Sequence, residues 1–408
     1  MTVLSKGFRF NPRSESFNKD PYSTYKEMSN NFPVYRIGNT WILTRHDDIQ
    51  HCLRHENLVT SGISDSLIDE FEKESIVIPD ELQDIIRSIL LFEEGERHDS
   101  HKKSMIRALS GEYFDELKRI IKMEVNKILG AIKDRQEVDI IYHIASPLWY
   151  SVFSRWLNLN QEEMEIVNQE GDNSRLLLDP SAINKKGLYA LAKALDRLNS
   201  VFTSHYSRIA SSSEKSLFFE SFNDACDKRN AQDYSIDCIT AFGGGSETTA
   251  ALIGNVFLLL ACYPAEQEKL RQQPKLLHNC IQEVMRFEPP LQMTRRRVTT
   301  EMYLHGKTFR AGDNILLCLG AANRDGSVFD SPDTFNIARK NSRKQLGFGV
   351  GMHQCVGQIL AQLQAEAVCE VMLRCYPCIK LADSNAYEWQ KDSLIIRSLS
   401  KLIIRTGL

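Results

Sequence analysis

The apolar and polar positions at the start of the chain predict short elements. A helix is expected over 20–31, and two alternating segments, 34–37 and 41–44, flank Gly38-Asn39, which is typical of a β-hairpin. Another helix is expected over 47–54, where two aspartates can cap the first turn. This part of the chain therefore predicts a small sheet with flanking helices.

From residue 58 to residue 208 the pattern changes between irregular segments and helices. Glycines, serines and a proline interrupt 58–92, so we expect a long loop with fragments of helix that closes over a site. A basic helix is expected over 96–109, and several amphipathic helices over 113–208. Within these helices, 168–186 is polar and is a second candidate for a mobile lid.

The most apolar helix is expected over 234–263, and three consecutive glycines, 243–245, lie in its middle. Each glycine destabilises a helix by about 1 kcal/mol relative to alanine. One interpretation is a local distortion that opens a groove, in which Glu247 and Thr248 supply a carboxylate and a hydroxyl that relay protons. The alternative is a short loop between two helices.

Towards the C-terminus, a helix over 275–287 carries Glu283 and Arg286 on one face, followed by two prolines and three arginines. Most such pairs lie on the surface and contribute well under about 1 kcal/mol. The elements expected after them are β segments over 302–304 and 314–319, an irregular stretch over 323–346 and a helix over 359–373.

A glycine-rich segment, FGVGMHQCVG over 348–357, separates the irregular stretch from the last helix. Glycines permit backbone conformations that other residues resist, so a loop can present the sulfur of Cys355 with N–H groups pointing at it. A metal thiolate needs this geometry. The alternative is a turn that happens to contain one of ten cysteines.

Composition narrows the class of protein. The 408 residues include 50 Lys and Arg against 53 Asp and Glu, a net charge of −3, which indicates neither nucleic-acid binding nor an acidic tail. The cysteines have no disulfide-framework spacing and no secretion signal is evident, so a reducing cytoplasm is expected. The apolar run over 250–263 is shorter than the ~20 residues that a membrane span requires, so no membrane association is expected.

Three motifs in register, the GGGSETT helix, Glu283-x-x-Arg286 before two prolines and the cysteine loop, resemble the cytochrome P450 family of haem-thiolate monooxygenases. The resemblance extends to Asn323-Arg324-Asp325 and Pro332-x-x-Phe335, and covers nearly the whole chain. It implies a mainly α fold with small β-sheets, as a single domain over 1–408. Haem b (iron protoporphyrin IX) would lie between a central distal helix and a proximal cysteine-loop helix.

The resemblance implies that Cys355, as a thiolate, is the axial ligand of the haem iron and favours O–O cleavage. Gly244 and Gly245 match small residues that make room for oxygen. Glu247 and Thr248 match the acid and alcohol pair that organises water and delivers two protons to dioxygen. The other haem contacts that the resemblance implies are His98, Lys102, Arg296, Phe348, Gly349, His353 and Gly357.

Two departures concern the haem propionates. Lys102 stands where the family commonly has arginine, and Gln345 where many bacterial members have histidine. Arg296, the best aligned of three consecutive arginines, is therefore expected to carry more of the propionate binding. Glu283 and Arg286 match a buried structural pair that, with Arg339, ties the irregular stretch to the core.

The implied reaction is oxidation of a small, largely apolar organic molecule by hydroxylation, epoxidation or oxidative coupling, in secondary metabolism. The pocket residues that the resemblance implies are Ala241, Gly244, Leu291, Met293, Thr294, Ser398 and Leu399. Two electrons from NAD(P)H would arrive through a separate ferredoxin or flavodoxin, since 408 residues leave no room for a fused reductase. Its docking face would be formed by Lys102, Lys103, Arg107, Arg343 and Lys344. We expect a monomer.

Two other functions are weighed against this one. A peroxide-driven relative would need no redox partner, but peroxide already contains reduced oxygen, so the presence of Glu247 and Thr248 argues against it. A non-catalytic haem sensor or carrier would use Cys355 only as a tether, and the acid and alcohol pair would have no purpose there.

Overall fold

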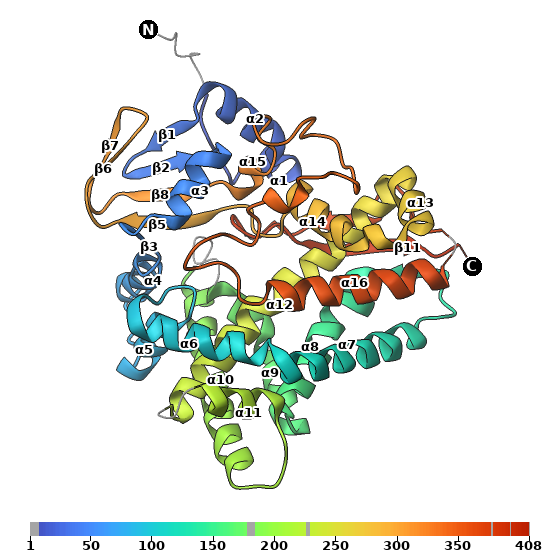
Figure 1. Ribbon diagram of the computed structural model, residues 1–408. Helices are drawn as coiled ribbons and strands as arrows, with labels where there is room; N and C mark the ends of the chain where they lie inside the picture. The colour runs from blue at the N-terminus through green and yellow to red at the C-terminus, as the bar shows by residue number, and fades with distance from the viewer. Residues whose placement is uncertain (1–7, 178–183, 226–228, 377, 392, 408) are drawn as a thin grey trace.

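The computed structural model describes residues 8–177, 184–225, 229–376, 378–391 and 393–407. Strands and short helices form the upper part of the molecule and long helices the lower part (Figure 1). The mainly α fold with small β-sheets that the motifs imply is confirmed.

The larger sheet has the strand order β1-β2-β8-β5-β3, in which β2 and β8 pair in parallel and the other neighbours pair antiparallel. Arg296 lies opposite Ile315 in the pairing of β5 with β8. The strands are β1 (Val34–Ile37), β2 (Thr40–Leu43), β3 (Leu58–Val59), β5 (Thr294–Val298) and β8 (Asn314–Leu317).

A second sheet has the order β10-β11-β4, with β9 also paired to β11, and β6 and β7 form a separate hairpin. It brings the C-terminal strand close to the helical part, because β11 packs against α12. The strands are β4 (Glu137–Asp139), β6 (Met302–Leu304), β7 (Lys307–Phe309), β9 (Lys380–Leu381), β10 (Tyr387–Trp389) and β11 (Leu399–Arg405).

The helices pack around α12, which contacts α6, α8, α10, α14 and α16. A single π-helical turn over Ile141–Ala145 precedes α8. The α-helices are α1 (Glu15–Lys19), α2 (Pro21–Asn31), α3 (His46–Arg54), α4 (Gly62–Lys73), α5 (Asp80–Ser88), α6 (Gly95–Ala108), α7 (Gly111–Ala131), α8 (Ser146–Leu157), α9 (Gln161–Ser174), α10 (Lys185–Ala210), α11 (Leu217–Ala225), α12 (Ala231–Cys262), α13 (Pro264–Gln272), α14 (Leu277–Phe287), α15 (Leu319–Ala322) and α16 (Gln358–Cys375).

The central helix α12 is continuous through its three glycines, so the alternative of a loop between two helices is wrong. A capping box starts it: the side chain of Asn230 accepts from the N–H of Asp233 at 3.1 Å, and the side chain of Asp233 accepts from the N–H of Asn230. Tyr263 and Pro264 end it. Length and composition alone would let α12 cross a membrane, but 72% of its most apolar 18-residue window is buried inside the protein. Packing against α6, α8, α10, α14 and α16 offsets the low helix propensity of the glycines.

Several boundaries differ from the prediction. The stretch 58–92 contains two regular helices, α4 and α5, rather than a long loop, because its apolar residues recur at helical spacing beneath the interrupting serines. Asp47 and Asp48 lie in the first turn of α3, whose N-cap is Arg45. The first part of the polar segment 168–186 is helical: it belongs to α9 and to a 3₁₀ turn that follows α9. Residues 178–183 of this segment lie outside the described residues.

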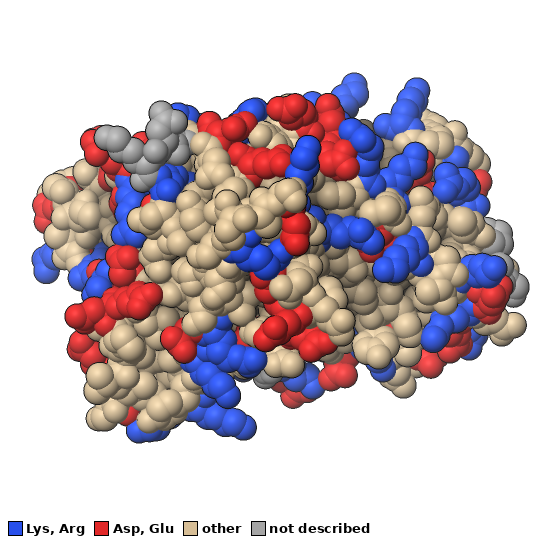
Figure 2. All heavy atoms as spheres, turned by 90° about the horizontal axis from the view of Figure 1, so that it is seen from below, with Lys and Arg blue, Asp and Glu red and all other residues tan. Residues whose placement is uncertain are grey.

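Charged side chains of both signs are interspersed on the face of the molecule seen from below (Figure 2). This mixture matches the balance of 50 basic against 53 acidic residues. This face does not carry the continuous basic surface that a nucleic-acid phosphate backbone requires.

Candidate active site

Glycines shape the loop that carries Cys355. Gly349 and Gly351 have φ angles of +66° and +85°, left-handed conformations that glycine adopts without strain. A side chain at Gly351 would also meet α3, since a Cβ there would lie 2.9 Å from the backbone oxygen of Leu53. A hydrogen bond of 2.9 Å from the Cys355 N–H to the carbonyl of Phe348 closes the loop. The cysteine is thereby held directly before α16.

The sulfur of Cys355 faces backbone donors. N–H groups of Gly357 and Gln358, at the start of α16, point at it. Burial raises the pKa of the Cys355 thiol, and these two hydrogen bonds oppose the rise. Cys355 is nevertheless an exposed residue, so the protein does not cover it completely. A thiol held in this way becomes a thiolate when a metal cation binds, and the donor set fits the axial ligand of a haem iron.

An open strip interrupts the buried surface of α12. Gly244 is exposed and 245–248 are half-buried, whereas most of the helix is buried. A Cβ on Gly244 would meet no atom within 4 Å. The hydroxyl of Thr248 donates to the carbonyl of Gly244 at 2.7 Å, and the carboxylate of Glu247 accepts from the hydroxyl of Ser398 at 2.9 Å. The strip can therefore take a small ligand beside a hydroxyl and a carboxylate.

Gly245 has a different role from the one that the resemblance implies. A Cβ on this residue would overlap the indole ring of Trp149 on α8. The absence of a side chain at Gly245 thus allows α8 and α12 to pack closely. Gly244, the residue before it, is exposed, and a Cβ there would meet no atom within 4 Å.

Basic side chains gather around His353. The ring of His98 lies 4.8 Å from that of His353, centroid to centroid, and the Nδ1 atom of His353 is buried without a hydrogen-bond partner among the described residues. On the same loop, the carbonyl of Met352 accepts a hydrogen bond from Lys102 of α6. A buried ring nitrogen without a partner and a lysine that donates to a carbonyl fit the carboxylate edge of a haem.

Arg296 is the most buried of the three arginines on β5. It is 3% exposed and forms no ion pair with a carboxylate among the described residues. Its guanidinium donates to the carbonyl of Arg295 at 2.8 Å and to the hydroxyl of Thr294 at 3.3 Å. Burial lowers the pKa of Arg296 to about 10, which shows how poorly this charge is solvated. Arg297, in contrast, is exposed, and Arg295 points to the opposite face of the strand.

Sequence reasoning missed Glu94 and Thr60, which orient His353. The Glu94 carboxylate lies 3.2 Å from Nε2 of His353 and accepts from the N–H and the hydroxyl of Thr60 at 2.7 and 2.9 Å. Burial acts to raise the pKa of Glu94, but these hydrogen bonds hold it at about 2. No motif marks either residue. Only the fold brings them to the cysteine loop.

Glu283, Arg286 and Arg339 form a buried cluster, as the motif implies. The carboxylate of Glu283, 0% exposed, accepts two bonds of 2.8 Å from Arg286 and lies 3.1 Å from Nε of Arg339. Both arginines also donate to backbone carbonyls of the irregular stretch: those of Asn323, Asp330, Ser331, Pro332 and Thr334. The cluster thus ties the segment before the cysteine loop to α14.

Two of the expected pocket residues pack into buried clusters. Met293 lies in the aromatic cluster under the larger sheet with Phe10 and Tyr25. Leu399 packs near Gly254, because a Cβ built on Gly254 would lie 3.4 Å from the Leu399 side chain. Gly254 follows Gly244 by ten residues along α12. Among the other expected pocket residues, Ser398 and Ala241 are buried and Leu291 and Thr294 are half-buried.

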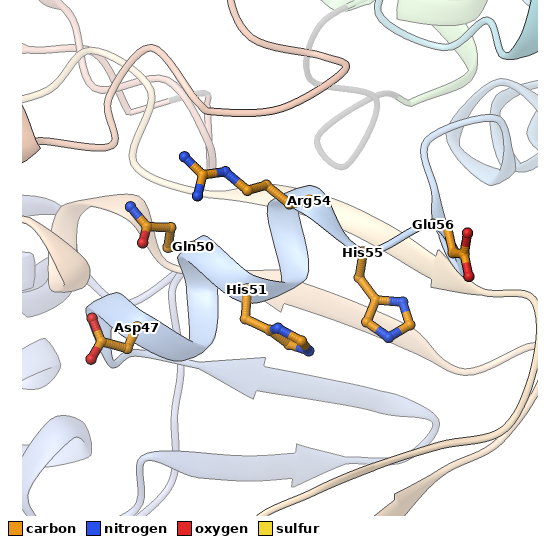
Figure 3. A pocket seen from close by; sticks show the side chains of 6 residues that line it. All are labelled: Asp47, Gln50, His51, Arg54, His55 and Glu56. Atoms are coloured by element: carbon orange, nitrogen blue, oxygen red, sulfur yellow. The ribbon is translucent and has the colours of Figure 1, made fainter.

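A cleft on the outer side of α3 is a separate feature. Figure 3 shows that its lining side chains all come from α3 and the two residues after it. His51 and His55 lie side by side there, with ring centroids 5.2 Å apart. Neither Cys355 nor the strip on α12 borders this cleft, so it is not the candidate active site.

The site combines a cysteine thiol held by N–H donors, an open strip on a buried helix and basic groups near the cysteine loop, which are the features of a haem-thiolate enzyme. The family model described as Cytochrome P450 matches residues 40–386. The chain belongs to the cytochrome P450 family and is a haem-dependent monooxygenase.

Relatives and solved structures agree with this assignment. A cytochrome P450 of Bacillus subtilis (strain 168) is 26% identical over 397 residues, covering 96% of this chain and 95% of that protein. The polyketide biosynthesis cytochrome P450 PksS of the same strain is 26% identical over 404 residues, covering 96% and 97%. The crystal structure of CalO2 superposes with a TM-score of 0.88 at 24% identity, covering 98% of this chain and 99% of that one. P450BioI, in complex with an acyl carrier protein ligated to hexadec-9Z-enoic acid, gives 0.85 at 24% identity, covering 96% and 100%.

Proposed function

We propose that this P450 oxidises a small, largely apolar organic molecule in bacterial secondary metabolism, with dioxygen and two electrons from a separate protein. The observation that carries the proposal is the open strip on α12, where Thr248 and Glu247 stand beside an exposed glycine. The names of relatives from polyketide and biotin biosynthesis support a biosynthetic role. The cytoplasm, which holds the reductants, is the proposed location.

Different residues of this chain would hold the iron and the carboxylates of the haem. Haem, when bound, supplies the centre at which dioxygen is reduced. Cys355 would hold it by the sulfur, and His98, Lys102, Arg296 and His353 would bind its carboxylates.

On the strip, the Thr248 hydroxyl donates its proton to the Gly244 carbonyl, so its oxygen accepts a hydrogen bond from water. Glu247 is held by Ser398 and can exchange protons with that water.

The test is a comparison of oxidants. A small-molecule library would first be screened for ligands that shift the haem spectrum from low to high spin. Turnover of a hit is then measured with dioxygen and a surrogate ferredoxin and reductase, and separately with hydrogen peroxide alone. Product only with dioxygen and electrons supports the proposal. Faster product formation with peroxide would favour a peroxygenase, and binding without product under either condition would favour a sensor.

The partner that we propose is a ferredoxin or flavodoxin, docking on the side of the cysteine loop. Of the five basic residues expected there, Arg107 is engaged by Asp224 at 3.1 Å and Lys102 by the carbonyl of Met352. Lys103, Arg343 and Lys344 are exposed and form no ion pair with the residues that the structure describes. The apolar side chains of Ile106, Met352 and Ile359 are 51%, 50% and 46% exposed on α6, the loop and α16. An apolar centre with a basic rim suits an acidic protein.

Reduction by an acidic partner is expected to slow with salt. Between about 0.05 and 0.5 M ionic strength the second-order rate should fall roughly tenfold, because salt screens steering by exposed charges. Stopped-flow spectroscopy of haem reduction measures this rate. Arg343→Gln should slow the reaction at low salt. The control variant Lys193→Gln, which changes an exposed lysine on α10, should leave the rate unchanged. Equal rates at both salt concentrations would contradict this docking face.

A further inference from the structure

Charged side chains are buried between α6 and α12, outside the residues assigned to haem. His101 of α6 lies with Nδ1 2.5 Å from the carboxylate of Asp237 on α12 and 2.7 Å from the guanidinium of Arg229, which itself donates to Asp237 at 2.8 Å. His101 and Asp237 are each 1% exposed. Such a cluster is stable only with its hydrogen bonds and its protons in place.

Glu93, two residues before α6, completes this cluster. One carboxylate oxygen lies 3.2 Å from Nε of Arg97, and the other is buried without a hydrogen-bond partner among the described residues, 4.0 Å from Nε2 of His101. A buried oxygen in this position is stable as the neutral acid and unfavourable as a carboxylate. Glu93 is therefore the group of the cluster whose ionisation leaves one buried carboxylate oxygen without a hydrogen-bond partner among the described residues.

The charges that face Glu93 come from every element around it. Besides His101 and Arg97 of α6, they are Asp237 and Asp233 of α12, Arg229 before that helix and Asp84 of α5. Burial raises the pKa of Glu93 to about 7, while His101 and Arg97 act to lower it. The proton on Glu93 is thus exchanged near neutral pH.

The cluster holds the helix that carries part of the haem clamp. His98 and Lys102 lie on α6 next to His101, and Glu94, adjacent to Glu93, orients His353 of the cysteine loop. We propose that Glu93 is a positioning residue whose protonated form locks α6 against α12, so that haem is held more tightly when Glu93 is neutral. The inference rests on the haem binding of the family and not on the substrate proposed above.

The direction of the pH dependence follows from linkage. Glu93 binds its proton more tightly in the folded protein than in the unfolded chain, so its contribution is complete below about pH 4.5 and is lost as the pH rises through about 7. Burial also lowers the pKa of His98 on the same helix below its usual range, so His98 is a second group whose charge changes with pH. A variant of Glu93 separates the two effects.

The experiment measures the transfer of haem from the holoprotein to excess apomyoglobin, from pH 5.5 to 8.5, together with the thermal midpoint of the holoprotein. In the wild type the rate should rise by up to about tenfold across the window and the midpoint should fall, since one proton is released. Glu93→Gln keeps the acceptor for Arg97 and cannot ionise. The rate of haem transfer from Glu93→Gln should equal that of the wild type at pH 5.5 and should not change up to pH 8.5. At pH 8.5 the variant should therefore retain haem better than the wild type.

Controls distinguish positioning from a merely structural role. Glu96→Gln changes an exposed glutamate on the same helix and should follow the wild-type profile. A flat wild-type profile would overturn the proposal without any variant. A Glu93→Gln protein with a profile parallel to that of the wild type, or with faster haem loss at every pH, would overturn it as well.

Discussion

Glu283→Gln is expected to destabilise the protein by roughly 3 to 5 kcal/mol and to abolish stable haem binding. The carboxylate is buried and is the anionic partner of two guanidinium groups, one of which, Arg286, is also fully buried. The amide cannot compensate these charges, and burial already lowers the pKa of Arg286. Denaturant unfolding and the haem content of the purified protein measure the effect.

A matched control exists on α7. Glu116 and Arg119 form an ion pair with the same three-residue spacing and a distance of 2.9 Å, but Arg119 is 77% exposed. Glu116→Gln should cost under about 1 kcal/mol and leave haem content unchanged. A Glu283→Gln protein that melts like this control and keeps its haem would refute the structural role of the cluster.

Glu247→Gln should lower the rate of product formation about a hundredfold, because it removes the ionisable group on the open strip. The amide can still accept the hydrogen bond from Ser398 at a similar position, so substrate binding and haem content should stay unchanged. Thr248→Ala should consume reductant at a comparable rate but release hydrogen peroxide in place of product. Product, peroxide and reductant consumption are measured in one assay.

Glu268→Gln serves as the control for both variants, since Glu268 is an exposed glutamate on α13 that accepts from Gln272. Full product formation by Thr248→Ala, with no peroxide, would show that the strip on α12 does not deliver protons. A loss of haem from Glu247→Gln would assign that residue a structural role instead.

Local patterns predicted much of the fold. The hairpin around Gly38-Asn39 and the helix capped by Asp20 are confirmed, because turn residues and caps act over a few neighbours. The continuity of α12 could not be predicted from its three glycines, because packing against other helices offsets their weak helix propensity. Propensity is local, whereas the burial that overrides it depends on the whole fold.

Site residues could be predicted where they belong to a sequence motif. They could not be predicted where only tertiary packing brings them to the site. The motif gave Cys355, and the structure shows its donors, but neighbouring glycines 244 and 245 differ in role, because the ring of Trp149 comes from α8. Glu94 was missed since its contact with His353 joins residues 259 positions apart. The expected pocket residue Met293 is buried in the aromatic cluster under the larger sheet, a contact that no motif indicates.

The most direct test of the account is the absorption spectrum of the dithionite-reduced carbonyl complex. With Cys355 as a thiolate ligand, the wild type should give the strongly red-shifted Soret band of a haem thiolate, and Cys355→Ser should lose it. Cys375→Ser, which changes an exposed cysteine at the end of α16, should keep that band. An unchanged carbonyl spectrum in Cys355→Ser would contradict the assignment of this sulfur as the iron ligand.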